Sequence, residues 1–200
     1  VVTHKARQSL EERWGLPIGA FFVVSFISGV SGAVPFIGFI VAFILGGPLA
    51  LGACVFSLKF VRNQEVQFED IFEGFNNFGK ALVLYLLQGL YVFLWMLLLI
   101  VPGVIAAIGY SQSFFILSEN PDMSPSEAID KSKQMMDGYK MQYFLLGFRF
   151  IGWALLCILT VGIGFLWLLP YIRISLAKFY IELKGDEMSD LLEEFHSEEV

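Results

Sequence analysis

The chain has 200 residues, of which 56% are hydrophobic and only 16% charged, and its formal net charge is −6. A soluble domain of this size has about 25% charged residues, and the mean hydropathy of this chain is +0.69. The composition excludes an ordinary soluble domain and predicts an integral membrane protein, with membrane lipids as partners and no nucleic acid.

Three long stretches with few charges follow one another along the chain. Residues 16–58 and 81–118 contain no Asp, Glu, Lys or Arg, and residues 141–181 contain only three cations. One crossing of the hydrocarbon needs roughly 20 apolar residues, so each stretch predicts two helices joined by a tight turn. Proline and glycine at 34–35, 101–103 and 162–164 mark the turns, because both disfavour a continuous helix. The six expected transmembrane helices are 17–34, 37–60, 81–101, 104–118, 141–161 and 165–182.

Two of these helices contain an internal proline. Gly46-Gly47-Pro48 predicts a kink or a re-entrant start in the second helix, and Pro170 predicts a break in the sixth. Cys54 and Cys157 also lie within expected helices. In apolar surroundings they are interpreted as small buried residues and not as a disulfide or redox pair.

The distribution of lysine and arginine predicts the orientation. The cations outside the expected helices lie in the N-terminal segment, the two long connections and the segment after the sixth helix, whereas the three short turns carry none. Cytoplasmic loops collect Lys and Arg. We therefore expect a multi-pass protein of the cell (plasma) membrane with the N and C termini in the cytoplasm.

Short amphipathic helices are expected in the cytoplasmic segments. Apolar residues recur at helical spacing over 66–79 and 125–137, and an acidic amphipathic helix is expected at 187–197. Ser124 to Glu127 has the pattern of a capping box, and Gly138 fits the end of the second of these helices. Their polar faces are mostly acidic and gain nothing from a negative leaflet. We expect the apolar stripes to pack against the bundle or a partner, with simple interfacial anchoring as the alternative.

The pattern divides the single membrane domain, 1–200, into three units of an interfacial helix and a hairpin. Their approximate limits are 1–62, 63–120 and 121–184. The predicted fold is thus an all-α polytopic bundle of about six transmembrane helices in three hairpins.

Few residues could carry out catalysis. The only histidines are His4 and His196, and no Asp or Glu lies in the interior of an expected helix. Neither a phosphate-binding Gly-rich loop nor a Gly-x-Ser-x-Gly motif is present. We therefore expect no enzymatic activity, no cofactor and no metal site.

Arg149 and Arg173 are the polar residues that most need an explanation. Both lie near the middle of neighbouring helices, where an arginine costs about 2.5–3.5 kcal/mol on insertion scales. They could extend to the headgroups, bond to freed carbonyls or to the amides of Gln88 and Gln112, or line a polar cavity that receives an anion. Arginine suits phosphate because its planar fork donates two parallel hydrogen bonds. Tyr110 and its polar neighbours could contribute to the same pocket.

Several motifs resemble a family of small prokaryotic membrane proteins, the domain-of-unknown-function 975 family. The motifs are Pro102-Gly103 with Tyr110, Ser-Glu-Asn-Pro at 118–121, Glu127-Ala128-Ile129 with Ser132, Met136 and Gly138, Phe150-Ile151-Gly152-Trp153, Gly162-Ile163-Gly164, Pro170-Tyr171 and Phe179-Tyr180. The family is also similar to the membrane domains of some glycerophosphodiester phosphodiesterases, which hints at lipids. The resemblance implies a location and an architecture but no activity. Arg149 stands where the family pattern leads us to expect a small or apolar residue.

Three hypotheses of function follow. The first is a non-enzymatic module that binds an anionic lipid or a membrane partner, which includes a second copy of the chain. The second is a small transporter or permease subunit, suggested by the repeated hairpins and the internal prolines. The third is a membrane scaffold or assembly factor whose 187–197 helix recruits a cytoplasmic partner.

Overall fold

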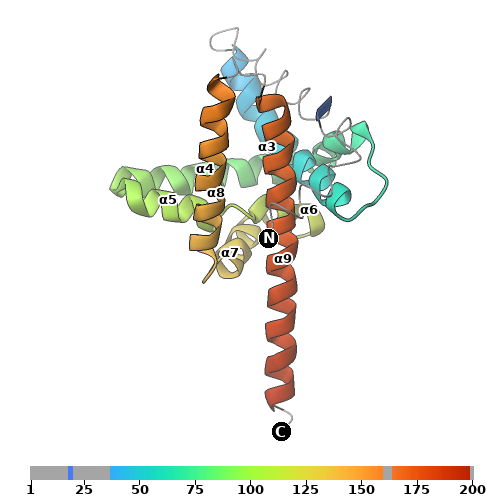
Figure 1. The fold of residues 1–200 in the computed structure, drawn as a ribbon, viewed down its shortest axis with the longest axis vertical. Coiled ribbons are helices and arrows are strands. Elements are labelled where there is room, and N and C mark those ends of the chain that lie inside the picture. The colour runs from blue at the N-terminus through green and yellow to red at the C-terminus, as the bar shows by residue number, and fades with distance from the viewer. Residues whose placement is uncertain (1–17, 20–36, 160–163, 199–200) are drawn as a thin grey trace.

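The computed structural model describes residues 18–19, 37–159 and 164–198, with side chains described over 43–158 and 164–185. Within these ranges the secondary structure is helical and contains no strand, which confirms the all-α prediction (Figure 1). Most of the first expected helix, 17–34, and most of the turn at 162–164 lie outside the described residues.

The described helices follow the predicted stretches closely. They are α3 (Ile37–Val61), η1 (Phe68–Asn77), α4 (Phe78–Leu98), α5 (Ile100–Gly109), α6 (Ser113–Glu119), α7 (Pro125–Met135), α8 (Lys140–Leu159) and α9 (Phe165–Glu198). Four described segments are long and apolar enough to cross a membrane: Phe43–Val61, Phe68–Leu98, Ile100–Glu119 and Lys140–Ile158. Helix α9 is not among these segments. In its part with described side chains, 165–185, any 18 consecutive residues include three charged ones, Arg173, Lys178 and Glu182.

The predicted breaks at Pro48 and Pro170 do not occur, since α3 and α9 each run continuously through their proline. The glycines near Pro48 serve packing instead. A Cβ at Gly52 would collide with the carbonyl oxygen of Ile71 in η1, and a Cβ at Gly74 would collide with that of Pro48. Helix α9 also continues to Glu198, so the sixth expected span and the 187–197 helix are one element.

The second hairpin turns earlier than predicted. The turn lies at Leu99, whose backbone is extended, and Pro102 and Gly103 belong to the first turn of α5. Proline is tolerated there because the first N–H groups of a helix have no intrahelical partner. The fourth expected helix is interrupted at 110–112, which separates α5 from the short α6.

The amphipathic prediction for 125–137 is confirmed. Ser124 Oγ accepts from the Glu127 N–H at 3.3 Å, the Glu127 carboxylate accepts from the Ser124 N–H at 2.8 Å, and Gly138 has a φ of +79°. The five residues of the predicted apolar stripe are all buried: Ala128, Ile129, Ser132, Met135 and Met136. Helix α7 therefore packs into the bundle. The 66–79 segment also packs on α3, but as the 3₁₀ helix η1.

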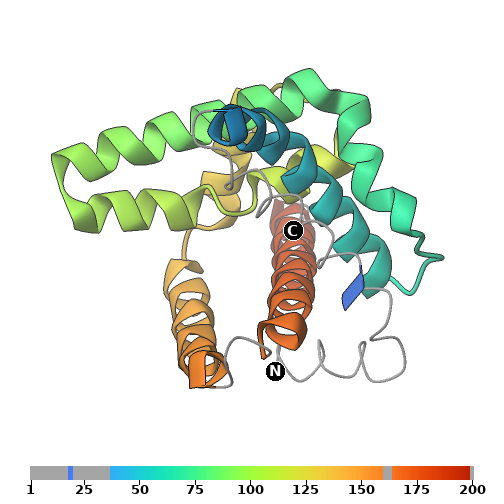
Figure 2. The same cartoon turned by 90° about the horizontal axis from the view of Figure 1, so that it is seen from above.

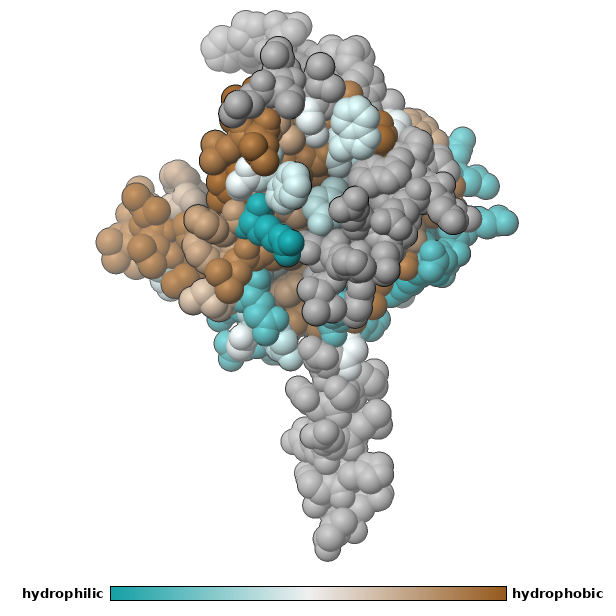
Figure 3. Space-filling model, viewed as in Figure 1, coloured by the Kyte–Doolittle hydropathy of each residue, from teal (hydrophilic) through white to brown (hydrophobic). Residues whose placement is uncertain are grey.

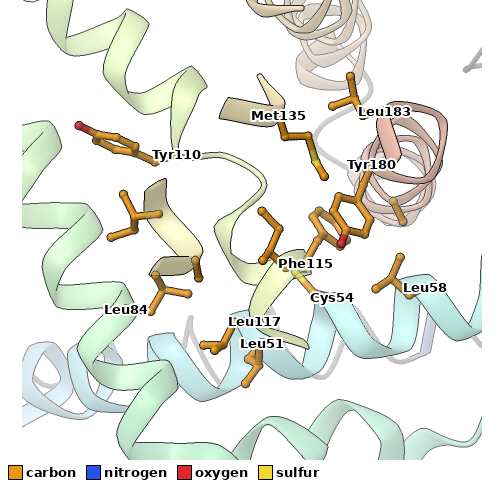
Figure 4. Close-up of a cluster of buried hydrophobic side chains, with 14 of the residues drawn as sticks. Leu51, Cys54, Leu58, Leu84, Tyr110, Phe115, Leu117, Met135, Tyr180 and Leu183 are labelled. Carbon is orange, nitrogen blue, oxygen red and sulfur yellow. The ribbon is translucent and has the colours of Figure 1, made fainter. Parts of the chain in front are cut away.

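The main apolar core lies where α3, α4, α6, α7 and α9 meet. Figure 4 shows Leu51 and Cys54 from α3, Phe115 from α6 and Tyr180 from α9 converging there. The rings of Phe115 and Tyr180 stack at 5.3 Å. Cys54 and Cys157 are buried and form no disulfide, as predicted.

Helices α4 and α5 lie across the direction of α8 and α9. In Figure 1 the α4–α5 hairpin runs horizontally while α8 and α9 run vertically, and Figure 2 shows the same crossing from above. The free end of the hairpin projects from the bundle, and Figure 3 shows it as an apolar lobe. The described helices are thus not all parallel, which periodicity could not indicate.

Candidate functional site

Two aromatic contacts join α8 to α9. The rings of Tyr143 and Phe179 meet edge to face at 5.5 Å, and those of Phe150 and Tyr171 at 5.8 Å. Because the two helices run in opposite directions, these contacts define one segment in which α8 and α9 face each other.

Arg149 and Arg173 both lie within this segment. Arg149 directly precedes Phe150, and Arg173 follows Tyr171 by two residues, on the side toward Phe179. At about 1.5 Å of rise per residue, the two arginines stand at nearly the same level. The structure thus places them at a common level on neighbouring helices, a relation that the sequence analysis did not include.

Both arginines are exposed, and apolar side chains surround them along their helices. Phe148 and Ile151 are exposed beside Arg149, and Trp167 and Leu169 are exposed on the turns before Arg173. Within the part of the chain that the structure describes, neither guanidinium makes a hydrogen bond or an ion pair. Each is therefore a cation on a largely apolar surface.

A polar cluster adjoins Arg173. Its guanidinium is within electrostatic range of Cys54 on α3 and Tyr143 on α8. Tyr143 in turn lies near Ser111, whose Oγ accepts from Gln112 Nε2 at 2.9 Å. The arginine is therefore close to polar residues at the interruption between α5 and α6.

Side-chain hydrogen bonds stabilise the non-helical residues 110–112 between α5 and α6. Ser132 Oγ on α7 donates to the Gly109 carbonyl at 2.7 Å and accepts from the Gln112 N–H at 3.2 Å. Ser113 Oγ donates to the Tyr110 carbonyl at 2.8 Å. The two bonds of Ser132 satisfy the Gly109 carbonyl and the Gln112 N–H at this interruption.

Gln112 has unused hydrogen-bonding capacity. Its side chain is fully buried, and Oε1 has no partner among the described residues. Turning the amide over would pair the oxygen with Ser111 but leave the nitrogen unpaired. Either orientation leaves a buried polar atom available beside the cluster, and such atoms are rare in native proteins.

Gln88 lies on the other side of the interruption. Its Nε2 donates to the Tyr110 carbonyl at 3.3 Å, and its Oε1 also has no partner among the described residues. Gln88 lines an apolar cavity of about 700 Å³ between α3, α4 and α6. Of the five predicted site residues, Gln88 bonds to the backbone of Tyr110 and Gln112 bonds to Ser111. Arg173 has only an electrostatic interaction with Tyr143 and Cys54, and Arg149 is related to Arg173 only by its level along the helices.

A second, smaller cavity contains two lysines. Lys133 and Lys140 line a cavity of about 270 Å³ with Trp95, Pro102 and Tyr110. The Lys133 ammonium lies 5.4 Å from the centre of the Tyr110 ring, and its hydrogen bond to Asp130 raises the pKa of Lys133 above its usual value. The cavity is therefore lined by apolar and aromatic side chains together with two charged lysines.

The prominent ionic site was missed by sequence reasoning. Glu119, at the end of α6, accepts from Tyr180 at 2.7 Å and from Lys184 at 2.8 Å, and it is also paired with Arg62. Glu119 therefore holds the ends of α3 and α6 to the middle of α9. The available signal was that Glu119 is the first charged residue after the uncharged stretch 81–118.

A similar ionic contact fixes η1. Lys59 on α3 pairs with Asp70 at 2.8 Å and with Glu73 at 2.6 Å. These charges serve the structure. Among the described residues, no group of three or more His, Cys, Asp or Glu side chains could hold a metal ion.

The comparisons with known proteins identify a family but no characterised relative. A family model described as "Protein of unknown function (DUF975)" matches the chain in two overlapping segments, residues 2–109 and 96–187. No curated protein and no solved structure matches the chain.

Proposed function

The chain belongs to the DUF975 family of proteins of unknown function, and we propose that it is a non-enzymatic membrane protein that binds an anionic lipid through Arg149 and Arg173. In this proposal the chain resides in the plasma membrane with both termini in the cytoplasm. The phosphate of a lipid headgroup accepts hydrogen bonds from the two guanidinium groups, and the acyl chains lie against the apolar side chains around them.

The observation that supports the proposal is that Arg149 and Arg173 stand at the same level along α8 and α9, and that neither forms an ion pair with an acidic residue in the described part of the chain. An arginine facing hydrocarbon is unfavourable by about 2.5–3.5 kcal/mol on insertion scales. A phosphate supplies the opposite charge and matches the planar fork of the guanidinium. Ser111 and Tyr143, which are partly exposed near Arg173, offer the anion polar groups on one side.

The test is the lipid that remains bound after purification in mild detergent, measured by native mass spectrometry. Losing a charged hydrogen bond worth about 1.5–3 kcal/mol weakens binding roughly ten-fold or more. We expect Arg173→Ala, and more strongly the double variant with Arg149→Ala, to lose retained anionic lipid. Arg173→Lys should retain an intermediate amount, because it keeps the charge but not the fork.

Lys131→Ala is the matched control, since it removes one positive charge from α7, away from the arginines. It should leave lipid retention unchanged. The proposal fails if the double arginine variant retains as much anionic lipid as the Lys131→Ala control.

A small transporter is a second candidate, favoured by the interruption of α5 and α6. Transporter sites are commonly built on discontinuous helices with unpaired polar groups, and Gln88 and Gln112 supply such groups here. The two candidates differ in transport. A transporter moves a labelled anionic lipid between the leaflets of reconstituted vesicles, whereas a binding module retains lipid without moving it.

A further inference from the structure

The free end of the α4–α5 hairpin is entirely apolar and exposed. The five residues from Leu97 to Val101 are 66–75% exposed. No charged residue and no Ser, Thr, Asn or Gln occurs anywhere in 89–109. An apolar surface of this kind is unstable in water and is not suited to the aqueous side of a membrane.

The base of the hairpin is charged. At Tyr110, where α5 ends, the Lys133 ammonium lies over the ring. Ser132 bonds to Gly109 and Gln112, so α7 runs back along α6 to this level. Helix α7 and the residues after it expose Asp130, Lys133 and Asp137. Charged side chains of α7 therefore lie at the level of the C-terminal end of α5, and we call this the charged level of the protein.

The distance from this charged level to the free end is too short for a crossing. Helix α5 has 10 residues, which span about 15 Å at 1.5 Å per residue, and the hydrocarbon layer is about 30 Å thick. If the free end reached the far surface, the charges of α7 would lie near the middle of the bilayer, where such residues are rare and unfavourable. If α7 lies at the interface, the free end stays within the hydrocarbon.

The direction of the hairpin leads to the same conclusion. Figures 1 and 2 show that α4 and α5 cross α8 and α9 steeply, so the two pairs cannot both follow the membrane normal. Both α4 and α8 are long enough to span the hydrocarbon, so length does not decide between the two pairs. The charges of α7 beside the end of α5 favour α8 as the helix that follows the membrane normal.

The turn itself is compatible with lipid. The Leu99 N–H donates to the Trp95 carbonyl at 3.0 Å, the Gly103 N–H donates to the Leu99 carbonyl at 3.2 Å, and Pro102 has no N–H. Few backbone donors are therefore left unpaired, as hydrocarbon requires. Gly103 lets α5 approach the backbone of Met96 closely, in the way that small residues join helices in membranes.

We propose that α4 and α5 form a re-entrant hairpin, which enters the bilayer from the side of Lys133 and Lys140 and ends in the hydrocarbon core. The occupant of its exposed apolar surface is the acyl-chain layer of the membrane. Both ends of the hairpin remain on one side, so the predicted orientation of the termini is unchanged. The inference does not depend on an anion at the arginines.

Single-cysteine labelling in reconstituted vesicles tests this placement. In a Cys54→Ala/Cys157→Ala background, Leu99→Cys places a thiol at the free end and Asp137→Cys places one on the 83% exposed side chain after α7. A charged maleimide that cannot cross membranes is added to either side. We expect Asp137→Cys to react from one side, and Leu99→Cys to react from neither side until the protein is unfolded in SDS.

A depth measurement completes the test. A fluorophore attached to Leu99→Cys should be quenched more by lipids with a nitroxide deep in the acyl chain than by lipids with a shallow one, and Asp137→Cys should show the opposite order. Ile100→Cys, the neighbouring position, repeats the measurement in case one variant fails to fold. Reaction of Leu99→Cys from the side opposite to Asp137→Cys would overturn the proposal in favour of a full crossing. Reaction from the same side would place the hairpin outside the bilayer and overturn it equally.

Discussion

Glu119 gathers three donors that are far apart in the sequence. Its side chain is only 12% exposed, yet it pairs with Arg62 and Lys184 and accepts from Tyr180. A carboxylate in a partly buried position needs such partners, because removal from water disfavours its charge. The three contacts join α3, α6 and α9, so a single residue links segments from all the described hairpins.

We expect Glu119→Ala to lower the free energy of unfolding by about 1–3 kcal/mol, because it leaves the partners of a charged group without their hydrogen bonds. This range is lower than for a fully buried pair, because Arg62 and Lys184 are partly exposed to solvent. Thermal unfolding in detergent measures the change. The control is Asp137→Ala, which removes an 83% exposed acid paired with Lys140 and should change stability by less than about 0.5 kcal/mol. Equal effects of the two substitutions would show that Glu119 does not hold the helices together.

Residue roles set by neighbours in sequence could be predicted, and those set by distant partners could not. The Ser124–Glu127 cap is a local pattern, so its spacing was sufficient to predict it. The partners of Glu119 lie 57, 61 and 65 positions away. The position of Arg149 and Arg173 near the middle of neighbouring helices follows from counting residues along each helix, whereas their common level and the Ser111–Gln112 hydrogen bond near Arg173 depend on the tertiary structure.

At the scale of elements, η1 and α3 approach so closely that their glycines are required. A Cβ on Gly52 would overlap the Ile71 carbonyl, which is part of the backbone and cannot move aside as a flexible side chain would. The close contact brings Lys59 within reach of Asp70 and Glu73. The Gly46-Gly47-Pro48 segment, which the sequence associates with a kink or a re-entrant start, lies in a continuous helix and provides a packing surface for η1 and α4.

Substitution of Gly52 tests this packing. Gly52→Ala should destabilise the protein by about 1–3 kcal/mol or more, the range for inserting atoms into a packed contact, as measured by thermal unfolding in detergent. Gly89→Ala is the matched control, because a Cβ there meets nothing within 4 Å. The account is contradicted if Gly52→Ala is as well tolerated as Gly89→Ala.

Elements with a periodic pattern and a cap were predicted well, and interruptions were not. Helix α7 had both signals, and its apolar stripe is buried as expected. The turn at Leu99 has no glycine or proline of its own, and the sequence therefore predicts the turn at the nearby Pro102-Gly103. The interruption at 110–112 depends on hydrogen bonds from Ser132 on another helix, and local composition does not reveal it.

At the scale of the whole molecule, the distribution of charge divides the protein into an apolar and an ionic part. The ion pairs of Lys59, Glu119 and Lys133 lie at the ends of helices, whereas the exposed surfaces of the α4–α5 hairpin and of α8 are largely apolar. Against this division Arg149 and Arg173 are exceptions, since they are exposed within an apolar segment. An anion brought by the membrane explains them without a partner from the described chain.

A structure determined in a bilayer that contains an anionic phospholipid tests this explanation most directly. The account predicts density for a headgroup phosphate within hydrogen-bond distance of the Arg173 guanidinium, with Arg149 at the same level. It would be contradicted if Arg173 bonded only to protein carbonyls, to the amides of Gln88 or Gln112, or to water, with no phosphate beside it.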